Sequence, residues 1–379
     1  MNVPKLRFKE FSDEWCETTL GETATFKQGI QVDVDKQFSK PFDNSVRFIR
    51  IVDYTQNTKD IRYISKPANA NYVDEHDVVL VRYGATAGFV GHGIKGVIAN
   101  NMFTVTPNSN INKDFLYTIL KQDKIYNKLN SSNGSSAMPA LNFGSVSILK
   151  FSYPSIDEQN KLTNLINLLD KKIELQTKKI EDLKLFKSYT KIRLFQNGDK
   201  TIKLGDILTK WNKKNKDGLI DYVESISNKF GFISQSDQFE DRNVASKDLK
   251  NYYVIEKNVF GYNPSRLNVG SLALKDNDNI SVVSPLYECF TTNQNNKFML
   301  EWFDSIYFKR GTLSRFEGGV RNTLNFTNLC EIEINLPSIE LQNKYATYLS
   351  TLDKKIKFEE QKLNGLKNLK KGLMQNMFV

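Results

Sequence analysis

Two long segments of the chain carry apolar side chains at alternating spacings of three and four residues. The first covers residues 154–198 and the second 337–379, and neither contains a proline after its opening Pro-Ser pair. This heptad spacing predicts two helices that pair as a coiled coil, each about 57 Å long if about 38 residues are helical. The seam positions are Leu162, Ile166, Leu169, Ile173, Ile180 and Leu183, and then Tyr345, Leu349, Leu352, Ile356, Leu363, Leu366, Leu373 and Met377.

The two segments are copies of each other. Residues 151–195 and 334–378 align without a gap at an offset of 183, and 16 of the 45 positions are identical. The same offset pairs residues 141–143 with 324–326, and an offset of 184 pairs 20–21 with 204–205. A repeat of this length indicates a tandem duplication, in which each half consists of one globular part and one long helix.

The globular parts, residues 1–153 and 199–336, contain short β-prone runs separated by turn signals and polar stretches. The runs are RFIRIVDY, DVVLVRYG and MFTVTP in the first part, and YYVIEKNVFGYN, ISVVSPLYECF and SIYFK in the second. We predict an α+β (mixed α/β) protein with a curved or barrel-like sheet in each part. Outside a few framework positions the two parts differ, as expected if each recognises something different.

The chain is basic, with a net charge of +10 and a pI near 9.2. The excess is +6 in residues 1–198 and +4 in 199–379, so both halves share it and no basic tail carries it. Because phosphates supply most of the free energy of protein–DNA binding, this balance favours nucleic acid as a partner. Charge alone does not decide the question.

The sequence has no recognisable catalytic or cofactor motif. The phosphate-binding pattern GxxxxGK[ST] does not occur, and the segment 262–265 lacks the second proline and the aromatic residue of an amino-methyltransferase motif. The only two histidines, His76 and His92, stand outside metal and nucleophile motifs. We therefore expect no catalytic residues and no bound metal.

The three cysteines, Cys16, Cys289 and Cys330, are scattered and form no CxxC or CxxH spacing, which argues against a zinc site and a disulfide framework. The N-terminal sequence has no apolar run after its positive charges, and no run of 18 apolar residues occurs. These features predict a cytoplasmic protein without a signal peptide or a membrane span.

Two half-repeats that each enter a long helix through Pro-Ser-Ile-x-x-Gln-Asn-Lys resemble the specificity subunit of Type I restriction–modification systems. The similarity covers the whole chain. It is strongest in residues 151–162, 168–174, 334–345 and 351–357, and it extends to 77–91 and 258–271. One departure is Leu341, since Glu158 holds the corresponding position in the first copy and the family usually has an acidic residue there.

The resemblance implies two target-recognition domains (1–153 and 199–336) separated by two conserved spacer helices (154–198 and 337–379) in an antiparallel coiled coil. Each domain would read one half of a bipartite, asymmetric DNA site, and the helices would set the spacing between the halves. It further implies that two methylation subunits dock on the helices and that restriction subunits join through them. S-adenosylmethionine, ATP and Mg would belong to those partners, which leaves this chain non-catalytic and without a cofactor.

Polar residues in loops of the two domains are the candidates for contact with DNA, because Arg, Lys, Asn and Gln read bases while Lys, Ser, Thr and Tyr also bind phosphates. They are Lys27, Gln28, Arg82, Tyr83, Asn100, Asn101, Ser135, Ser136, Lys213, Lys214, Lys229, Asn263, Ser265, Arg266 and Arg321. Four apolar residues off the helix seam are candidates for contact with partner subunits: Phe186, Tyr189, Phe358 and Leu369.

Two other interpretations remain open at this point. A coiled-coil adaptor with two protein-binding domains would show the same duplication, although the basic balance of both halves argues against it. A fused methyltransferase is opposed by the missing cofactor and catalytic motifs.

Overall fold

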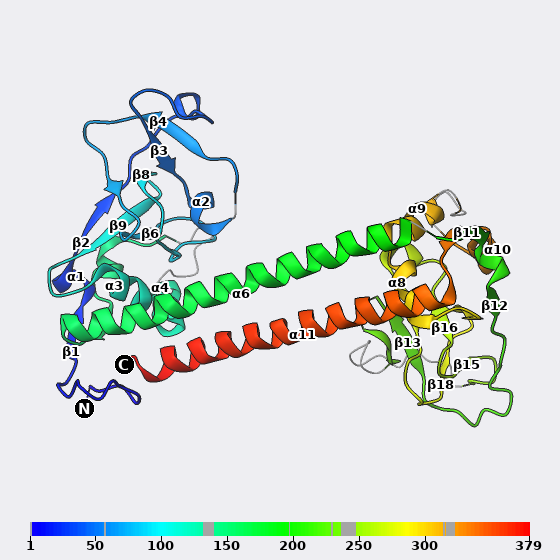
Figure 1. The fold of residues 1–379 in the computed structure, drawn as a ribbon. Helices are drawn as coiled ribbons and strands as arrows, with labels where there is room; N and C mark the ends of the chain where they lie inside the picture. Colours follow the sequence, from blue (N-terminus) through cyan, green and yellow to red (C-terminus); the bar gives the residue numbers. More distant parts are fainter. Residues whose placement is uncertain are drawn as a thin grey trace. The chain divides into compact units, whose positions relative to one another are not determined.

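The computed structural model of the chain describes residues 2–56, 58–131, 140–196, 198–228, 230–235, 248–313, 315 and 323–379. The chain divides into two compact units. Unit 1 comprises residues 1–176 and 362–379, and unit 2 comprises residues 177–361. Each unit therefore contains one globular domain together with parts of both long helices (Figure 1).

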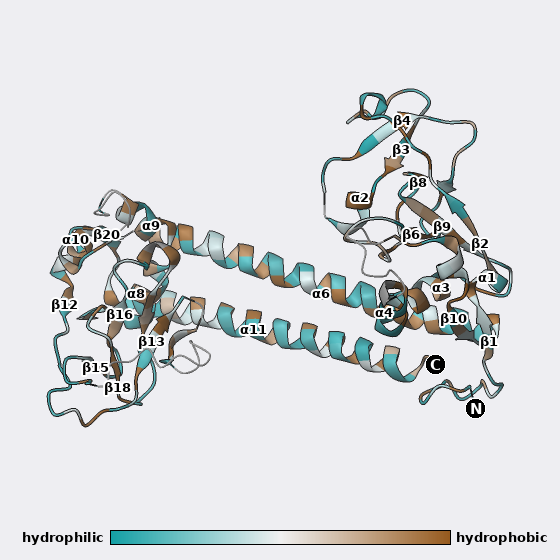
Figure 2. Ribbon diagram, turned by 180° about the vertical axis from the view of Figure 1, so that it is seen from behind, coloured by the Kyte–Doolittle hydropathy of each residue, from teal (hydrophilic) through white to brown (hydrophobic). Residues whose placement is uncertain are grey.

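The two predicted helices are confirmed as α6 (Ile156–Gln196) and α11 (Ile339–Asn376), green and orange to red in Figure 1. Hydrophilic and hydrophobic residues alternate along both (Figure 2). In unit 1 an ion pair of 2.5 Å joins Asp170 to Lys370, and Leu162 shares a core with Phe378. Since earlier residues of α6 contact later residues of α11, the two segments are antiparallel in this unit.

The same pairing recurs in unit 2. Lys187 lies 2.7 Å from Asp353, and Lys184 lies 2.6 Å from Glu360. The first pair is the Asp170–Lys370 pair displaced by 183 residues, with the lysine on the other helix. The antiparallel arrangement of the helices, which the family resemblance implied, is thus present within each unit.

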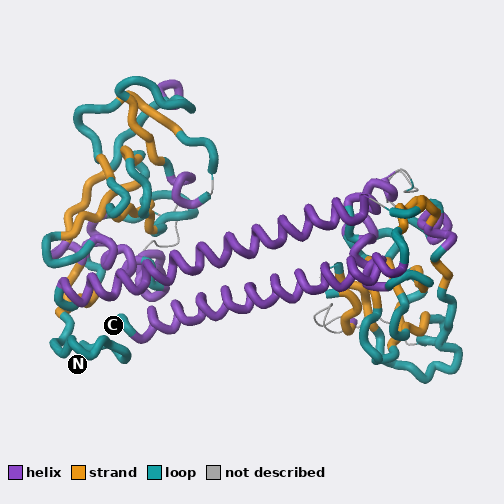
Figure 3. The backbone as a smooth tube through the Cα atoms, in the orientation of Figure 1, coloured by secondary structure: helices purple, strands orange, loops and turns teal. Residues whose placement is uncertain are grey.

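The strands of the first domain are short and are separated by loops (Figure 3). They form one pair and two sheets of four strands, in which β3 and β8 are parallel. The pair is β1 (Cys16–Thr19) with β10 (Lys150–Tyr153); the first sheet is β2 (Ala24–Gln28), β9 (Met102–Pro107), β6 (Val78–Val81) and β7 (Val90–Gly91); the second is β4 (Arg62–Ser65), β3 (Ser45–Ile49), β8 (Gly96–Ile98) and β5 (Tyr72–Val73). The helical elements are α1 (Leu20–Thr23), η1 (Val34–Lys36), α2 (Ile51–Thr55), α3 (Lys113–Leu120), α4 (Asp123–Ser131) and α5 (Phe143–Ser147).

The second domain has one sheet of four strands and three antiparallel pairs. The sheet is β12 (Leu208–Lys210), β19 (Glu288–Thr292), β16 (Phe260–Tyr262) and β17 (Leu272–Leu274). The pairs are β11 (Lys200–Lys203) with β20 (Glu333–Leu336), β13 (Glu224–Ser227) with β14 (Gly231–Ser234), and β15 (Tyr253–Ile255) with β18 (Ser281–Val283). The helical elements are η2 (Leu204–Asp206), η3 (Leu267–Val269), α8 (Asn296–Phe303), α9 (Ile306–Leu313) and α10 (Phe326–Cys330).

The duplication is also visible in elements of the domains whose sequences differ. Helices α3 and α8, α5 and α10, and strands β10 and β20 all begin 183 residues apart. Packing follows the same rule: Phe378 at the end of α11 lies 6.0 Å (ring centroids) from Phe115 of α3, and Phe195 at the end of α6 lies 5.4 Å from Phe298 of α8. The end of each long helix therefore fills the core of the domain that the other long helix follows.

The sequence prediction was wrong in several details. The described strands do not form one curved or barrel-like sheet in each domain, because turns send neighbouring strands into separate sheets. One such turn separates β15 from β16, which were predicted as one run, and it contains Asn258 with a φ of 72°. RFIRIVDY is a strand only up to Ile49, because the backbone amide of Arg50 donates to the Asp53 carboxylate at 2.7 Å and helix α2 follows.

SIYFK, predicted as a strand, begins helix α9 instead. The hydroxyl of Ser305 accepts a hydrogen bond from the backbone amide of Phe308 at 3.3 Å. Phe308 is buried against Trp302 and Phe303, with ring centroids 5.4 and 5.1 Å away. Packing in the core outweighs the β-propensity of these aromatic residues.

The start of each long helix is fixed differently at one position. In unit 1 Glu158 is 1% exposed and accepts two hydrogen bonds from the guanidinium of Arg7, at 2.8 and 2.7 Å. Leu341 holds the corresponding position in unit 2 and has no such group to offer. The departure noted in the sequence therefore removes one ion pair and leaves the helix in place.

Candidate nucleic-acid interface

Three of the predicted DNA-binding residues of unit 1 are linked by hydrogen bonds at one edge of the β2–β9–β6–β7 sheet. Arg82 follows β6, Gln28 ends β2, and Asn100 lies in the turn before β9. A guanidinium nitrogen of Arg82 donates to Oε1 of Gln28 at 2.8 Å, and Nε2 of Gln28 donates to the backbone carbonyl of Asn100 at 2.7 Å. Adjacent strands carry the three side chains to the same edge, as expected for residues that follow or end paired strands.

Aromatic rings support the Arg82 side chain. Its guanidinium carbon lies 4.8 Å from the ring centroid of Tyr83 and 5.3 Å from that of Phe143. Its Nε also donates to the backbone carbonyl of Leu141 at 3.2 Å. A guanidinium held by aromatic rings and hydrogen bonds has few rotamers to lose when it binds an anion or a base edge.

The local sequence explains why the edge is built this way. The strand before Arg82, VVLV, is buried at every position, so it anchors the arginine from within the sheet. Gly29, which follows Gln28, packs directly on the backbone of residues 98–99: a Cβ at Gly29 would lie 2.3 Å from the carbonyl oxygens of Ile98 and Ala99. Only glycine allows this approach, which brings Gln28 beside Asn100.

Only some of the other predicted residues of unit 1 lie at this edge. Tyr83 is 38% exposed at the same edge. Asn101 also lies there, because its backbone carbonyl accepts a hydrogen bond from the backbone amide of Arg82 at 2.8 Å. Lys27 points elsewhere, because successive residues of a strand face opposite sides; its ammonium donates to the carbonyl of Ala70 at 3.0 Å. Ser135 and Ser136 lie outside the described residues.

In unit 2 the loop after β16 occupies the corresponding position of the framework. The backbone amide of Leu324 donates to the carbonyl of Pro264 at 3.1 Å, just as the amide of Leu141 donates to the carbonyl of Arg82 at 2.9 Å. Next to Pro264, Oδ1 of Asn263 accepts from the Ser265 amide at 3.0 Å, which shapes a tight polar turn. Ser265 and Arg266 are exposed on it.

The remaining predicted residues of unit 2 lie apart from that loop. The ammonium of Lys213 is paired with Glu256, and that of Lys214 donates to the carbonyl of Asn251 at 2.7 Å and lies 3.8 Å from the ring centroid of Tyr253. Lys229 and Arg321 lie outside the described residues. The structure thus brings together Asn263, Ser265 and Arg266, and it does not bring Lys213 and Lys214 to them by any hydrogen bond among the described residues.

Three residues of this interface were missed. Gln31 accepts a hydrogen bond from the Asn100 side chain at 3.1 Å, Phe143 supports Arg82, and Lys210 lies 5.6 Å from the ring centroid of Phe326. Phe143 and Phe326 are 183 residues apart, so a cation lies over the same aromatic position in both repeats. The repeated Leu-Asn-Phe triplet could have identified the two phenylalanines. Nothing in the sequence singles out Gln31.

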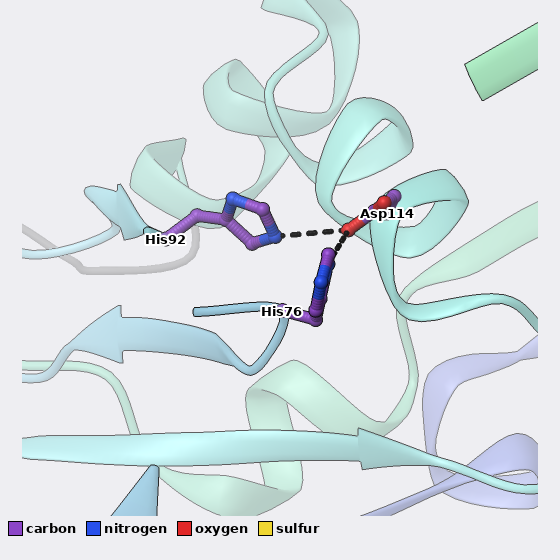
Figure 4. A group of neighbouring side chains, drawn as sticks. All are labelled: His76, His92 and Asp114. Carbon is purple, nitrogen blue, oxygen red and sulfur yellow. Dashed lines mark hydrogen bonds and ion pairs between the residues drawn. The ribbon is translucent and has the colours of Figure 1, made fainter. Parts of the chain in front are cut away.

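A second polar cluster lies at the opposite end of β6. His76 precedes this strand, and Arg82 follows it. Nδ1 of His76 and Nε2 of His92 each lie 3.1 Å from the same carboxylate oxygen of Asp114 (Figure 4). The hydrogen bond to Asp114 raises the pKa of His76, whereas burial lowers the pKa of His92. Sequence reasoning treated the two histidines separately, because only the fold brings them together.

The two repeats differ where the end of each long helix packs against the domain that the other long helix follows. In unit 2 Lys191 and Lys187 pair with Glu301, at 3.0 and 2.9 Å, beside a cavity of about 280 Å³. In unit 1 the positions of Lys191 and Glu301 are taken by Met374 and Thr118, and the groove measures about 710 Å³. Its floor and rim include Tyr117, Ile166, Phe378, Lys121, Lys124, Lys367, Lys370 and Lys371.

The four apolar residues predicted to contact partner subunits lie on the surfaces of the long helices. Phe186 is 48% exposed, Tyr189 59%, Phe358 54% and Leu369 51%. None belongs to the apolar clusters described for the two units. Among the described residues, no helix is both long enough and apolar enough to cross a membrane.

A duplicated framework that presents different polar loops at the same edge defines a two-domain recognition protein. Comparison with known families identifies which one: the chain belongs to the family of the Type I restriction modification DNA specificity domain, whose model matches residues 12–185 and 198–368. It is therefore a Type I specificity subunit that recognises DNA with two domains.

Known proteins are similar to this chain over nearly their whole length. The specificity subunit of the Type I restriction enzyme MjaVIII from Methanocaldococcus jannaschii is 22% identical over 98% of this chain and 94% of its own. The crystal structure of a Type I restriction–modification S subunit from M. genitalium covers 100% of this chain and 99% of its own, with a TM-score of 0.63 and 14% identity. A chain from a study of complex assembly and conformational transition of the Type I system covers 96% and 97%, with a TM-score of 0.58 and 13% identity. The two structures share the fold of this chain.

Proposed function

We propose that each globular domain reads one half of a bipartite, asymmetric DNA site. The observation that carries the proposal is the pair of equivalent backbone hydrogen bonds, Leu141 to Arg82 and Leu324 to Pro264. They fix one framework in both domains, and different side chains stand beside them. Arginine is the commonest bidentate reader of guanine, and asparagine of adenine, so two different loops in one position would read different bases.

In unit 1, Arg82 would be the base-reading residue, with Gln28, Tyr83, Asn100 and Asn101 around it. In unit 2, Asn263, Ser265 and Arg266 would take this role. Lys213 and Lys214 remain candidates for phosphate contact, because such contacts can lie away from the bases that are read. Lys27 is a weaker candidate, since its ammonium is held by the Ala70 carbonyl.

The helices would act as a spacer between the two readers. Recognition helices of other dimeric DNA-binding proteins reach half-sites roughly 34 Å apart, one turn of DNA, and two domains on helices of this length could do the same. Removing seven residues from each helix should then change the gap between the half-sites, or abolish activity, without changing the bases read.

The exposed surfaces of α6 and α11 would hold two methylation subunits, through residues such as Phe186, Tyr189, Phe358 and Leu369, and restriction subunits would join through them. Aromatic residues at half exposure are the type enriched at such interfaces. Catalysis, and with it S-adenosylmethionine, ATP and Mg, would belong to the partners, and this chain would be non-catalytic.

The test is DNA binding by the chain in complex with its methylation subunits, measured on a site library at several salt concentrations. We expect Arg82→Ala to relax one half of the selected site and Arg266→Ala to relax the other, each by about 1–3 kcal/mol at one position. Affinity should fall with salt, because bound phosphates release counterions. Relaxation of the same half by both variants would contradict the proposal, and so would loss of affinity on all sequences alike.

A further inference from the structure

We propose that His76, His92 and Asp114 form a binding site for one divalent transition-metal ion, of the class of Zn²⁺. The three side chains come from three segments: the turn before β6, the loop between β7 and β8, and the first turn of α3. They are the sole group of three or more His, Cys, Asp or Glu residues with suitably placed donor atoms in the described part of the chain. A ring nitrogen of each histidine faces the same carboxylate oxygen of Asp114 (Figure 4).

The distances between the donor atoms suit a small ion. Zinc binds imidazole nitrogen and carboxylate oxygen at about 2.0–2.2 Å, which places two ligands of a tetrahedral site roughly 3.3 Å apart. Both histidine nitrogens lie 3.1 Å from Oδ1 of Asp114, and all three donor atoms lie within 4.8 Å of one another. The His76 and His92 nitrogens, which lie within 4.8 Å of each other, would move to about 3.3 Å apart on binding, and a fourth position would remain for water.

Two of the three ligands are already held in place. Asn112 caps helix α3 by accepting a hydrogen bond from the Asp114 amide at 2.8 Å, and this fixes the backbone that carries the carboxylate. The His92 ring stacks on Tyr117 of the same helix at 4.3 Å, with 18° between the planes. His76 has a side chain that is 64% exposed, so it can rotate toward the ion at small cost.

The surrounding charges favour a cation. His76 belongs to the sequence Asp-Glu-His-Asp at residues 74–77, an acidic run in a basic protein. Lys113 offsets part of this charge through ion pairs with Asp77 at 2.6 Å and Asp74 at 3.3 Å.

A bound ion would cross-link three segments of the chain at the end of β6 that lies opposite Arg82. It would stabilise unit 1 by binding only the folded chain, and it would leave the DNA-reading edge free. The inference does not depend on the proposed function, because none of the three ligands belongs to the candidate DNA interface.

The paucity of histidine makes the test sharp. The chain has two histidines, so selective ¹⁵N labelling of imidazole gives signals from these two residues alone. When ZnCl₂ is added to the full chain after treatment with EDTA, we expect both imidazoles to shift and to saturate at one equivalent. We also expect Tm to rise by several degrees, and Co²⁺ to give the visible absorption of a four-coordinate site.

Three variants separate a metal site from a hydrogen-bonded triad. His92→Asn and Asp114→Asn should weaken zinc binding at least tenfold. His76→Asn alters an exposed side chain and should preserve the fold while it weakens binding, so a folding defect in the other two cannot hide the result. Cys16→Ser, which removes the exposed thiol, should bind zinc as the unmodified chain does. Unshifted imidazoles with added zinc, or equal binding by His76→Asn, would overturn the proposal.

Discussion

The side-chain oxygen of Gln159 accepts a hydrogen bond from the backbone amide of Asn112 at 2.9 Å. In the second repeat Gln342 accepts from the amide of Asn295 at 3.1 Å. Both glutamines are 0% exposed, and each also donates to the carbonyl of the proline that precedes its helix, at 2.8 and 2.9 Å. The repeated glutamine thus ties the start of each long helix to the helix cap of its own domain.

Gln159→Leu should destabilise the protein by about 1–3 kcal/mol, because it leaves the partly buried backbone amide of Asn112 without its acceptor. Urea unfolding, followed by circular dichroism, measures this change. The matched control is Gln361→Leu, an exposed position of α11, which should change stability little. Equal stability of the two variants would show that the repeated glutamine has no structural role.

The core of the second domain contains a buried ion pair between Lys275 and Glu224, which are 1% and 4% exposed. Ser281 donates to the same carboxylate at 2.5 Å. Lys275→Met should cost about 3–5 kcal/mol, because it leaves a buried carboxylate unpaired. The double variant Lys275→Met with Glu224→Leu should recover most of that loss. A double-mutant cycle in thermal unfolding checks this, and a double variant no more stable than Lys275→Met would refute the account.

The Glu301 network predicts a dependence of stability on pH. Burial alone would raise the pKa of Glu301, but the ammonium groups of Lys191 and Lys187 outweigh burial and hold the pKa below the usual 4.5. Because the folded pKa is the lower one, ionised Glu301 stabilises the protein above about pH 4.5, and this contribution is lost as the pH falls through the folded pKa.

Glu301→Gln should therefore unfold more easily than the unmodified chain at pH 7, and the difference should shrink toward pH 3. Chemical unfolding across this range measures both quantities. Glu340→Gln, whose side chain is 78% exposed and pairs with Lys344, should show little difference at any pH. A Glu301→Gln deficit that stays constant from pH 7 to pH 3 would exclude the ion-pair explanation.

Substitution of Arg82 by lysine should weaken discrimination at one base position, even though the charge is kept. Lysine cannot form the planar pair of hydrogen bonds to a guanine edge, nor stack between Tyr83 and Phe143 in the same way. Competition between the selected site and single-base variants measures this effect. Lys27→Ala is the useful comparison, and we expect it to leave base discrimination unchanged.

The sequence predicted the duplication and both helices correctly, because heptad spacing and a gap-free repeat are local patterns. It also placed Arg82 at the end of a buried strand, since VVLV (residues 78–81) is a continuous apolar run. It failed where tertiary packing decides: Ser305 and Phe308 form a helix against Trp302, and Lys27 faces away from Gln28. The proximity of His76, His92 and Asp114 depends on the packing of two loops against helix α3, and no spacing pattern in the sequence indicates it.

The central claim is that each domain reads its own half of the site. The most direct test maps modified adenines across a genome carrying this chain and its methylation subunits, before and after residues 199–336 are replaced by the corresponding domain of another specificity subunit. We predict a bipartite motif in which one half changes while the other half and the gap stay the same. A change in both halves, or in neither, would contradict the claim.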